Sequence, residues 1–283
     1  QIAADQVGVR PEDITVVSGD TSTIPLGLGG FASRQTVTAG NSVHLAARAV
    51  REKAIMAAAR LLDVPEESLD IRDGIVIETG KNLSISLREI ADSLAGAPGY
   101  KMPAGMAPGL ESAINFETSA LTYGIGAHAC EVEVDALTGG VTLLNYVAVN
   151  DCGRIINPMT AEGQIHGGAV HGISNALFEW MGFDANAQPL TTNLADYLLP
   201  TAPEIPSLNV HLVEYPSPKN PLGVKGIGES GTVPAAAAVI SGIEDALRDY
   251  GLRIEEAPIS PVRIFELIRA SKAASLTLSA DRS

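Results

Sequence analysis

Apolar residues recur along this sequence with two different periods, and the alternation of these periods predicts both helices and strands. Recurrence every three or four residues predicts helices, whereas short β-branched runs bounded by turn residues predict strands. The predicted helices cover residues 1–7, 38–62, 87–94, 161–178, 234–250 and 262–268. The predicted strands cover residues 14–17, 75–77, 129–134, 141–149 and 210–214.

This order of helices and strands predicts an α+β (mixed α/β) fold in two subdomains. Residues 95–111 are rich in Pro and Gly, which indicates a long loop or a subdomain boundary. We therefore expect a first subdomain over residues 1–110 and a second over residues 111–283. Residues 1–7 resemble the middle of a helix, without a cap or an initiator Met. The expectation is a fragment, a processed product or one piece of a split polypeptide.

Composition narrows the function classes. The formal net charge of −14 argues against a partner that is nucleic acid or an anionic membrane, because both attract basic surfaces. No apolar run reaches the roughly 18 residues of a membrane span, and no basic segment typical of a signal peptide opens the chain. Cys130 and Cys152 form neither a disulfide framework nor a CxxC pair. We expect no metal-ligand set in this chain, and the cytoplasm as its compartment.

Residues 225–231, Lys-Gly-Ile-Gly-Glu-Ser-Gly, are the first candidate for chemistry. The spacing of Gly226, Gly228 and Gly231 matches a dinucleotide fingerprint, but such a loop follows its strand at once, whereas a Pro-rich segment intervenes here. Glu229 has small neighbours that leave its carboxylate open to a ligand. In a dry pocket its pKa would rise, which suits a general base. The alternative is a Glu favoured by the dipole of the following helix.

Residues 27–36 form a second candidate, because glycines allow backbone amides to make an anion nest ahead of a helix. Ser33, Arg34 and Thr36 add hydroxyl and guanidinium donors, which suits a phosphate or pyrophosphate. The alternative is an ordinary Gly-rich turn.

Residues 150–158 form a third candidate, since their polar side chains follow an apolar strand. Residues 162–168 then open a helix with small residues that allow close packing. We expect His128, His166 and His171 to serve packing or hydrogen bonding. Cys152 as a nucleophile is a weaker alternative, because no histidine is near it in sequence.

Taken together and in order, these stretches resemble the molybdenum-binding subunit of the xanthine oxidase family. That family includes aldehyde oxidoreductases, CO dehydrogenase and bacterial N-heterocycle hydroxylases. The resemblance runs from residue 1 to about residue 270. The matching segments are residues 18–21, 29–36, 126–128, 131–135, 151–153, 156–158, 162–164, 166–168, 225–226 and 228–229.

The resemblance implies that Glu229 is the catalytic base of a hydroxylation that takes its oxygen from water. It also implies a molybdopterin cofactor carrying molybdenum, in the cytosine dinucleotide form, with no protein ligand to the metal. The residues that would bind the cofactor are Gly29, Gly30, Phe31, Ala32, Ser33, Arg34, Thr36, Asp151, Cys152, Arg154, Asn157, Gln164, Lys225, Gly226 and Gly228.

Partner chains are implied as well, because the glutamine-glycine loop of the family would lie before residue 1. We expect a second molybdenum-binding chain or an upstream domain, an iron–sulfur subunit with [2Fe-2S] clusters, and an FAD subunit, in a dimerised hetero-oligomer. The substrate would be a small molecule with an aldehyde or N-heteroaromatic carbon, while a purine or CO also stays open. The alternatives are a non-catalytic scaffold or assembly subunit with the same fold, and a nicotinamide dehydrogenase.

Overall fold

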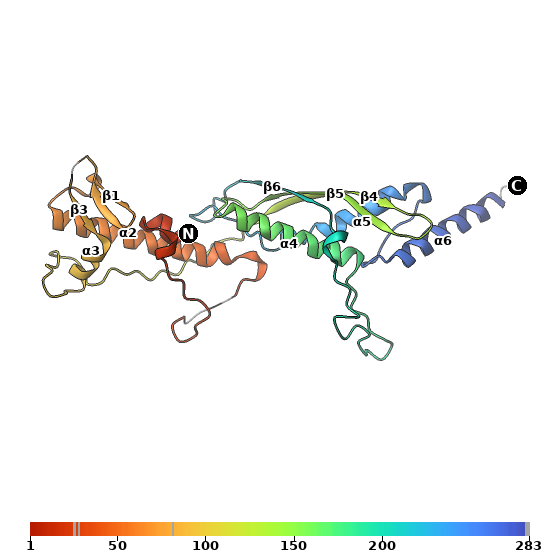
Figure 1. Ribbon diagram of the computed structural model, residues 1–283, viewed down its shortest axis with the longest axis horizontal. Coiled ribbons are helices and arrows are strands. Elements are labelled where there is room, and N and C mark those ends of the chain that lie inside the picture. The colour runs from red at the N-terminus through yellow and green to blue at the C-terminus, as the bar shows by residue number, and fades with distance from the viewer. Residues whose placement is uncertain (25–26, 28, 81, 281–283) are drawn as a thin grey trace. The chain divides into compact units, whose positions relative to one another are not determined.

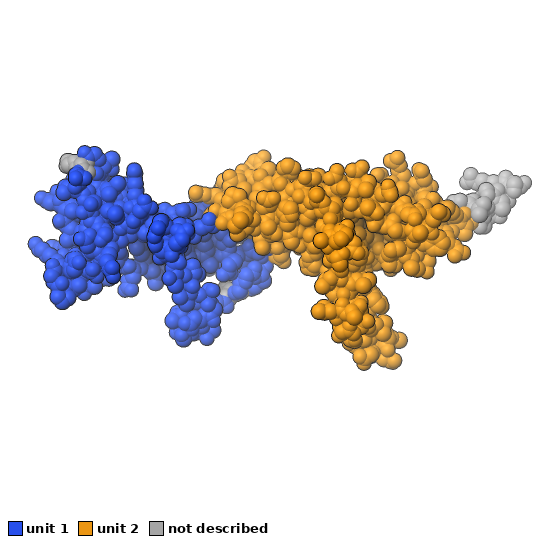
Figure 2. Space-filling model, viewed as in Figure 1, with its two compact units in different colours: residues 1–121, 217–224 blue, residues 122–216, 225–283 orange. Residues whose placement is uncertain are grey.

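The computed structural model describes residues 1–24, 27, 29–80 and 82–280. The chain forms two compact units, which are coloured separately in Figure 2. Unit 1 comprises residues 1–121 and 217–224, and unit 2 comprises residues 122–216 and 225–283. The chain therefore leaves unit 1, returns to it for one short segment, and leaves it again.

Unit 1 combines helices with a small antiparallel sheet. Its helices are α1 (Ile2–Val7), α2 (Asn41–Leu62) and α3 (Leu87–Leu94), and a π-helical turn, Thr36–Gly40, leads into α2. Its strands β1 (Leu69–Arg72), β2 (Ile75–Glu78) and β3 (Ser84–Ser86) pair in sequence order. Alanines on α2 let it approach the sheet and α3 closely. The resulting core contains Ala54, Ala57, Ala58, Ile71, Val76, Ile90 and Leu94.

Unit 2 is built on a three-stranded mixed sheet (Figure 1). Strand β4 (Ile125–Val134) pairs antiparallel with β5 (Val141–Asp151), and β6 (Leu208–Val213) pairs with β5 in parallel. A parallel pair needs a crossover, and α4 (Pro158–Leu177) lies in that connection. Helices α5 (Ala235–Ala246) and α6 (Pro261–Ala280) follow β6. Buried residues of the strands and the helices share one core, including Tyr146, Ile165, Ile173, Val239, Ile243 and Ile264.

The mixed α+β fold is confirmed, and each predicted helix has a counterpart. The strand predicted over residues 14–17 is wrong. This segment pairs with no strand in the described part of the chain, and the side chains of Val16 and Val17 are 80% and 63% exposed. β-Branched residues favour a pleated surface only where a neighbouring strand is available to pair. Strands β1 and β3 were not predicted, because β1 carries charged residues at every second position and β3 has only three residues, two of them serine. Among the described residues, no helix is both long and apolar enough to cross a membrane.

Candidate active site

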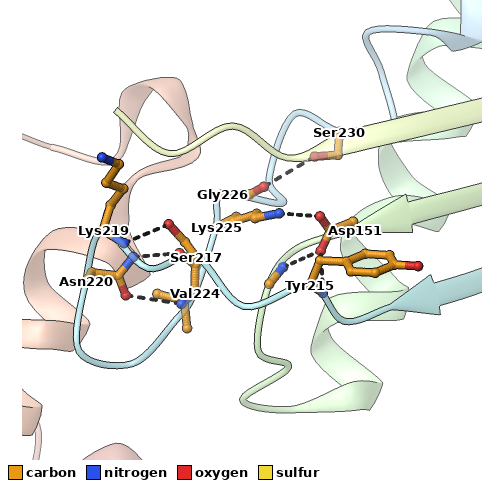
Figure 3. A network of polar contacts seen from close by, with 10 residues as sticks. Asp151, Tyr215, Ser217, Lys219, Asn220, Val224, Lys225, Gly226 and Ser230 are labelled. Carbon is orange, nitrogen blue, oxygen red and sulfur yellow. Dashed lines mark hydrogen bonds and ion pairs between the residues drawn. The ribbon is translucent and has the colours of Figure 1, made fainter. Parts of the chain in front are cut away.

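The carboxyl end of β5 is fixed by Asp151, whose side chain is buried (Figure 3). Its carboxylate accepts hydrogen bonds from the backbone N–H groups of Gly153 (2.8 Å) and Tyr215 (3.1 Å) and forms an ion pair with Lys225. Burial alone would raise the pKa of Asp151, but the hydrogen bonds from Lys225, Gly153 and Tyr215 together lower it. The residue therefore stays a carboxylate at neutral pH and holds the ammonium group of Lys225.

Lys225 is also held through its backbone, because its N–H donates to the carbonyl oxygen of Cys152 at 2.7 Å. The structure thus brings together Asp151, Cys152 and Lys225, three residues predicted to contact the cofactor. Gly226 lies beside Gly124 at the start of β4. A Cβ on Gly124 would lie 3.0 Å from the carbonyl oxygen of Gly226 and 3.1 Å from that of Asp151.

Glu229 lies in a turn that runs directly into α5, and its side chain is exposed. Its carbonyl oxygen accepts hydrogen bonds from the N–H groups of Thr232 (3.0 Å) and Val233 (3.2 Å). One residue along, the hydroxyl of Ser230 donates to the carbonyl oxygen of Gly226 at 3.4 Å. The turn is therefore held by its own backbone hydrogen bonds.

Glycines allow this turn to pack directly on α4. A Cβ on Gly168 would lie 2.9 Å from the Cα of Gly231, and one on Gly231 would lie 2.5 Å from the carbonyl oxygen of Ile165. The hydroxyl of Thr232 donates to the carbonyl oxygen of Gly168 at 3.1 Å. The close packing expected for residues 162–168 is therefore made with the turn that carries Glu229.

Two other predicted residues, Arg154 and Asn157, lie on the segment that leads into α4, and Gln164 lies in the helix itself. Asn157 caps this helix, because its side-chain oxygen accepts from the N–H of Thr160 at 3.1 Å. Arg154 and Gln164 are exposed. The cap explains Asn157 without a ligand, whereas Arg154 and Gln164 are open to one.

In unit 1, the Gly-rich loop adopts a backbone suited to anion binding. Gly29 has a φ of 72°, followed by Gly30 at −96°, and both Ala32 and Ser33 have a positive φ, 56° and 55°. Non-glycine residues in this region cost about 1–3 kcal/mol each. When neighbouring residues alternate between left-handed and right-handed backbone conformations, their successive N–H groups point to one side, as in an anion nest. Leu28 of this predicted stretch lies outside the described residues.

Arg34 and Thr36 lie between the glycines of this loop and α2. The guanidinium of Arg34 lies 3.7 Å from the ring centroid of Phe31, which is a cation–π contact. Thr36 begins the π-helical turn before α2. The loop therefore leads into the N-terminal end of a long helix, where backbone N–H groups favour an anion.

The histidine and cysteine near the end of β5 have structural surroundings. The Nδ1 of His128 is 2.8 Å from the hydroxyl of Tyr146, and the side-chain amide nitrogen of Asn150 is 3.2 Å from its Nε2. Burial lowers the pKa of His128 despite the hydrogen bond with Asn150. Burial and the charge of Asp151 raise the pKa of the Cys152 thiol, which argues against a nucleophile.

A buried amide pair in unit 1 was not foreseen from the sequence. The side-chain amide of Asn41 donates to the side-chain oxygen of Asn220 (3.2 Å) and to the carbonyl oxygen of Val37 (2.8 Å). The Asn41 oxygen accepts from the N–H of Leu222 at 3.0 Å. Asn220 in turn donates to the carbonyl oxygen of Val224 at 2.9 Å (Figure 3). This pair fixes the segment immediately before Lys225.

No group of three or more His, Cys, Asp or Glu residues that could hold a metal ion occurs in the described part of the chain.

Comparisons with known proteins relate this geometry to one family. The family model described as molybdopterin cofactor-binding domain matches residues 1–206. The chain is 39% identical over 266 residues to the 6-hydroxypseudooxynicotine dehydrogenase complex subunit gamma of Paenarthrobacter nicotinovorans, over 94% of this chain and 33% of the relative. It is 37% identical over 270 residues to the carbon monoxide dehydrogenase large chain of Hydrogenophaga pseudoflava, over 95% of this chain and 33% of the relative. The chain thus spans about a third of the length of these curated relatives.

The chain also superposes on solved structures. Reconstituted CO dehydrogenase from Oligotropha carboxidovorans superposes with a TM-score of 0.87 at 31% identity, over 96% of this chain and 34% of the other. Quinoline 2-oxidoreductase from Pseudomonas putida 86 superposes with a TM-score of 0.83 at 37% identity, over 95% of this chain and 34% of the other.

Proposed function

The chain belongs to the molybdopterin cofactor-binding domain family, within the molybdenum-binding subunits of the xanthine oxidase family, and we propose that it supplies the catalytic base of a molybdenum hydroxylase. The reaction is the hydroxylation of an aldehyde or N-heteroaromatic carbon with oxygen from water. The observation that carries the proposal is the exposed carboxylate of Glu229 on a turn whose start is fixed by the Asp151–Lys225 ion pair.

The cofactor in this proposal is molybdopterin in its cytosine dinucleotide form. When bound, it supplies the two-electron oxidation, which the protein side chains cannot perform. Residues 29–36 fit a pyrophosphate, because their backbone alternates between left-handed and right-handed conformations before α2 and Arg34 adds a cation. The other residues proposed to hold the cofactor are Asp151, Cys152, Arg154, Asn157, Gln164, Lys225, Gly226 and Gly228.

Glu229 acts in this mechanism by accepting a proton from the oxygen that attacks the substrate carbon. The packing of its turn on α4 and the hydrogen bonds to its carbonyl oxygen hold the backbone in place. A fixed backbone limits the positions that the carboxylate can reach, which favours proton transfer over the few ångströms required. The Asp151–Lys225 pair contributes by neutralising a lysine close in sequence to the base.

Other polypeptide must complete the enzyme, since the chain spans about a third of its curated relatives. We place the remainder of the molybdenum-binding subunit, an iron–sulfur subunit and an FAD subunit in the same complex. Electrons leave through the iron–sulfur and flavin centres, and the compartment is the cytoplasm.

The test of this proposal is the variant Glu229→Gln in the natively purified complex. The amide keeps the size of the side chain but accepts no proton at neutral pH. We expect kcat to fall by about 10²–10⁴-fold, while the molybdenum and cytosine nucleotide content per copy stays unchanged. Glu131→Gln, at an exposed position of β4, is the matched control and should keep full turnover. Turnover of Glu229→Gln within about tenfold of wild type would contradict the role of the base.

Metal and nucleotide analysis of the same complex tests the cofactor separately. One molybdenum and one cytosine nucleotide per copy are expected. A folded complex without either, although its host can load them, would favour the non-catalytic scaffold instead.

A further inference from the structure

An arm formed by residues 179–200 leaves the end of α4 and returns toward β6. It projects from the body of unit 2 (Figures 1 and 2). The arm is ordered by its own polar contacts. The N–H of Leu190 donates to the carbonyl oxygen of Gly182 at 2.8 Å, and the N–H of Gly182 donates to the hydroxyl of Thr191 at 3.3 Å. At its turn, the carboxylate of Asp184 accepts from the N–H groups of Asn186 and Gln188. Its shape thus depends little on an apolar core.

The apolar side chains of the arm are turned outward. Leu194 is 82% exposed, and Trp180 is 53% exposed although its indole lies against Gly182. Single exposed apolar residues are normal, but several on one projecting segment are typical of an interaction site. The exposed apolar residues of the arm include Trp180, Met181, Phe183, Leu190, Leu194 and Leu198.

The charge of the arm is of one sign. The sequence contains no Lys or Arg between Arg154 and Lys219. The arm itself carries Glu179, Asp184 and Asp196. Pairing with the same arm of a second copy would bring like charges together, which disfavours a wrong partner. A surface that combines apolar residues with Lys or Arg is complementary to both properties of the arm.

We propose that the arm docks into an apolar groove, edged by Lys or Arg, on the part of the molybdenum-binding subunit that lies outside the matched third. This inference rests on the proposed function. The superposition with the CO dehydrogenase chain covers 96% of this chain and therefore includes at least part of the arm. The same superposition covers only 34% of the CO dehydrogenase chain. Relatives with the same fold therefore have additional polypeptide of about twice this length available to cover the arm.

The experiment is site-specific photo-crosslinking in the natively purified complex, with p-benzoylphenylalanine in place of Leu194. The matched control carries the same probe at Leu137, a leucine that is also 82% exposed but lies in the turn between β4 and β5. We expect the probe at Leu194 to crosslink to peptides of the molybdenum-binding polypeptide outside the matched third, with Lys or Arg nearby. The probe at Leu137 should give no such product. Crosslinks from Leu194 to a second copy of the arm, to the iron–sulfur or FAD subunit, or to nothing would overturn the docking.

A second measurement does not depend on the probe. In Leu194→Glu with Leu198→Glu, backbone hydrogen exchange across residues 179–200 should become at least about tenfold faster in the complex, because a buried carboxylate opposes docking. Leu137→Glu should leave this exchange unchanged, and equal exchange in the wild type and the double variant would overturn the docking. Molybdenum content and turnover of the wild-type complex separate the two proposals. An active complex in which the arm is solvent-exposed would contradict the docking proposal alone. A complex in which the arm is covered but molybdenum is absent would contradict the proposed hydroxylase function alone.

Discussion

Asp151 is the residue whose charge the candidate site most depends on. In Asp151→Asn the side chain keeps its shape, but the ammonium of Lys225, whose side chain is only 12% exposed, loses its counter-charge. We expect a loss of about 3–5 kcal/mol in the free energy of unfolding, measured by urea denaturation of the complex. Asp70→Asn removes the more exposed pairs with Arg51 and Arg72 and should cost about 0–1 kcal/mol for each pair. Equal losses in the two variants would contradict the role given to the buried pair.

The pH dependence of the same variant gives an independent measurement. Hydrogen bonds lower the pKa of folded Asp151 below the value of an unfolded Asp, about 3.9. A lowered folded pKa means that the stabilisation is fully present above the unfolded value and is lost as pH falls through the folded value. Unfolding of the wild type as pH falls below about 4 should therefore show a loss of stability that Asp151→Asn lacks. Parallel curves for the two proteins in this window would contradict the assignment.

At the scale of elements, the close contact between α4 and the turn that carries Glu229 depends on two residues without a side chain, Gly168 and Gly231. Gly168→Ala would place a methyl group 2.9 Å from the Cα of Gly231, and backbone atoms cannot swing aside as a flexible side chain can. We expect this variant to lose about 1–3 kcal/mol of stability by overpacking. Gly167→Ala, one residue earlier on the same helix, meets no atom within 4 Å and should be neutral or gain up to about 1 kcal/mol. Thermal unfolding of both variants checks this, and similar behaviour of the two would sink the packing argument.

The elements themselves could be predicted from the sequence where their periods are long and regular, as in α2, α4 and β5. The strand predicted over residues 14–17 is wrong, because residues with a high strand propensity form a strand only when a partner strand lies alongside. At the site, Asp151 and Lys225 were each predicted to contact the cofactor, but their ion pair joins residues 74 positions apart. No local pattern encodes such a pair. The roles proposed for the site residues stay predictions, as does the division into subdomains at residue 110.

The whole molecule is organised by a chain that visits unit 1 twice. Its second visit, residues 217–224, ends directly before Lys225, and the turn with Glu229 follows in unit 2. The buried amides of Asn41 and Asn220 hold this returning segment against the start of α2. Within unit 1 the amide pair fixes residues 217–224, and within unit 2 Asp151 fixes Lys225, the residue at which the chain leaves unit 1.

This connection predicts that a change on α2 will loosen the segment that bears the base, although the two are far apart in sequence. Asn41→Ala leaves the buried N–H of Leu222 without its partner, at about 1–3 kcal/mol, while the Asn220 oxygen keeps the hydrogen bond from the N–H of Val224. A loss of 1.4 kcal/mol corresponds to about a tenfold change in an opening equilibrium. We therefore expect backbone hydrogen exchange at least about tenfold faster over residues 217–224, and measurably faster over residues 225–231, which continue the same backbone. Asn145→Ala, at an exposed position of β5, should change neither peptide. Faster exchange over residues 217–224 alone would contradict the predicted effect on residues 225–231 and would show that Asp151 is sufficient to hold them.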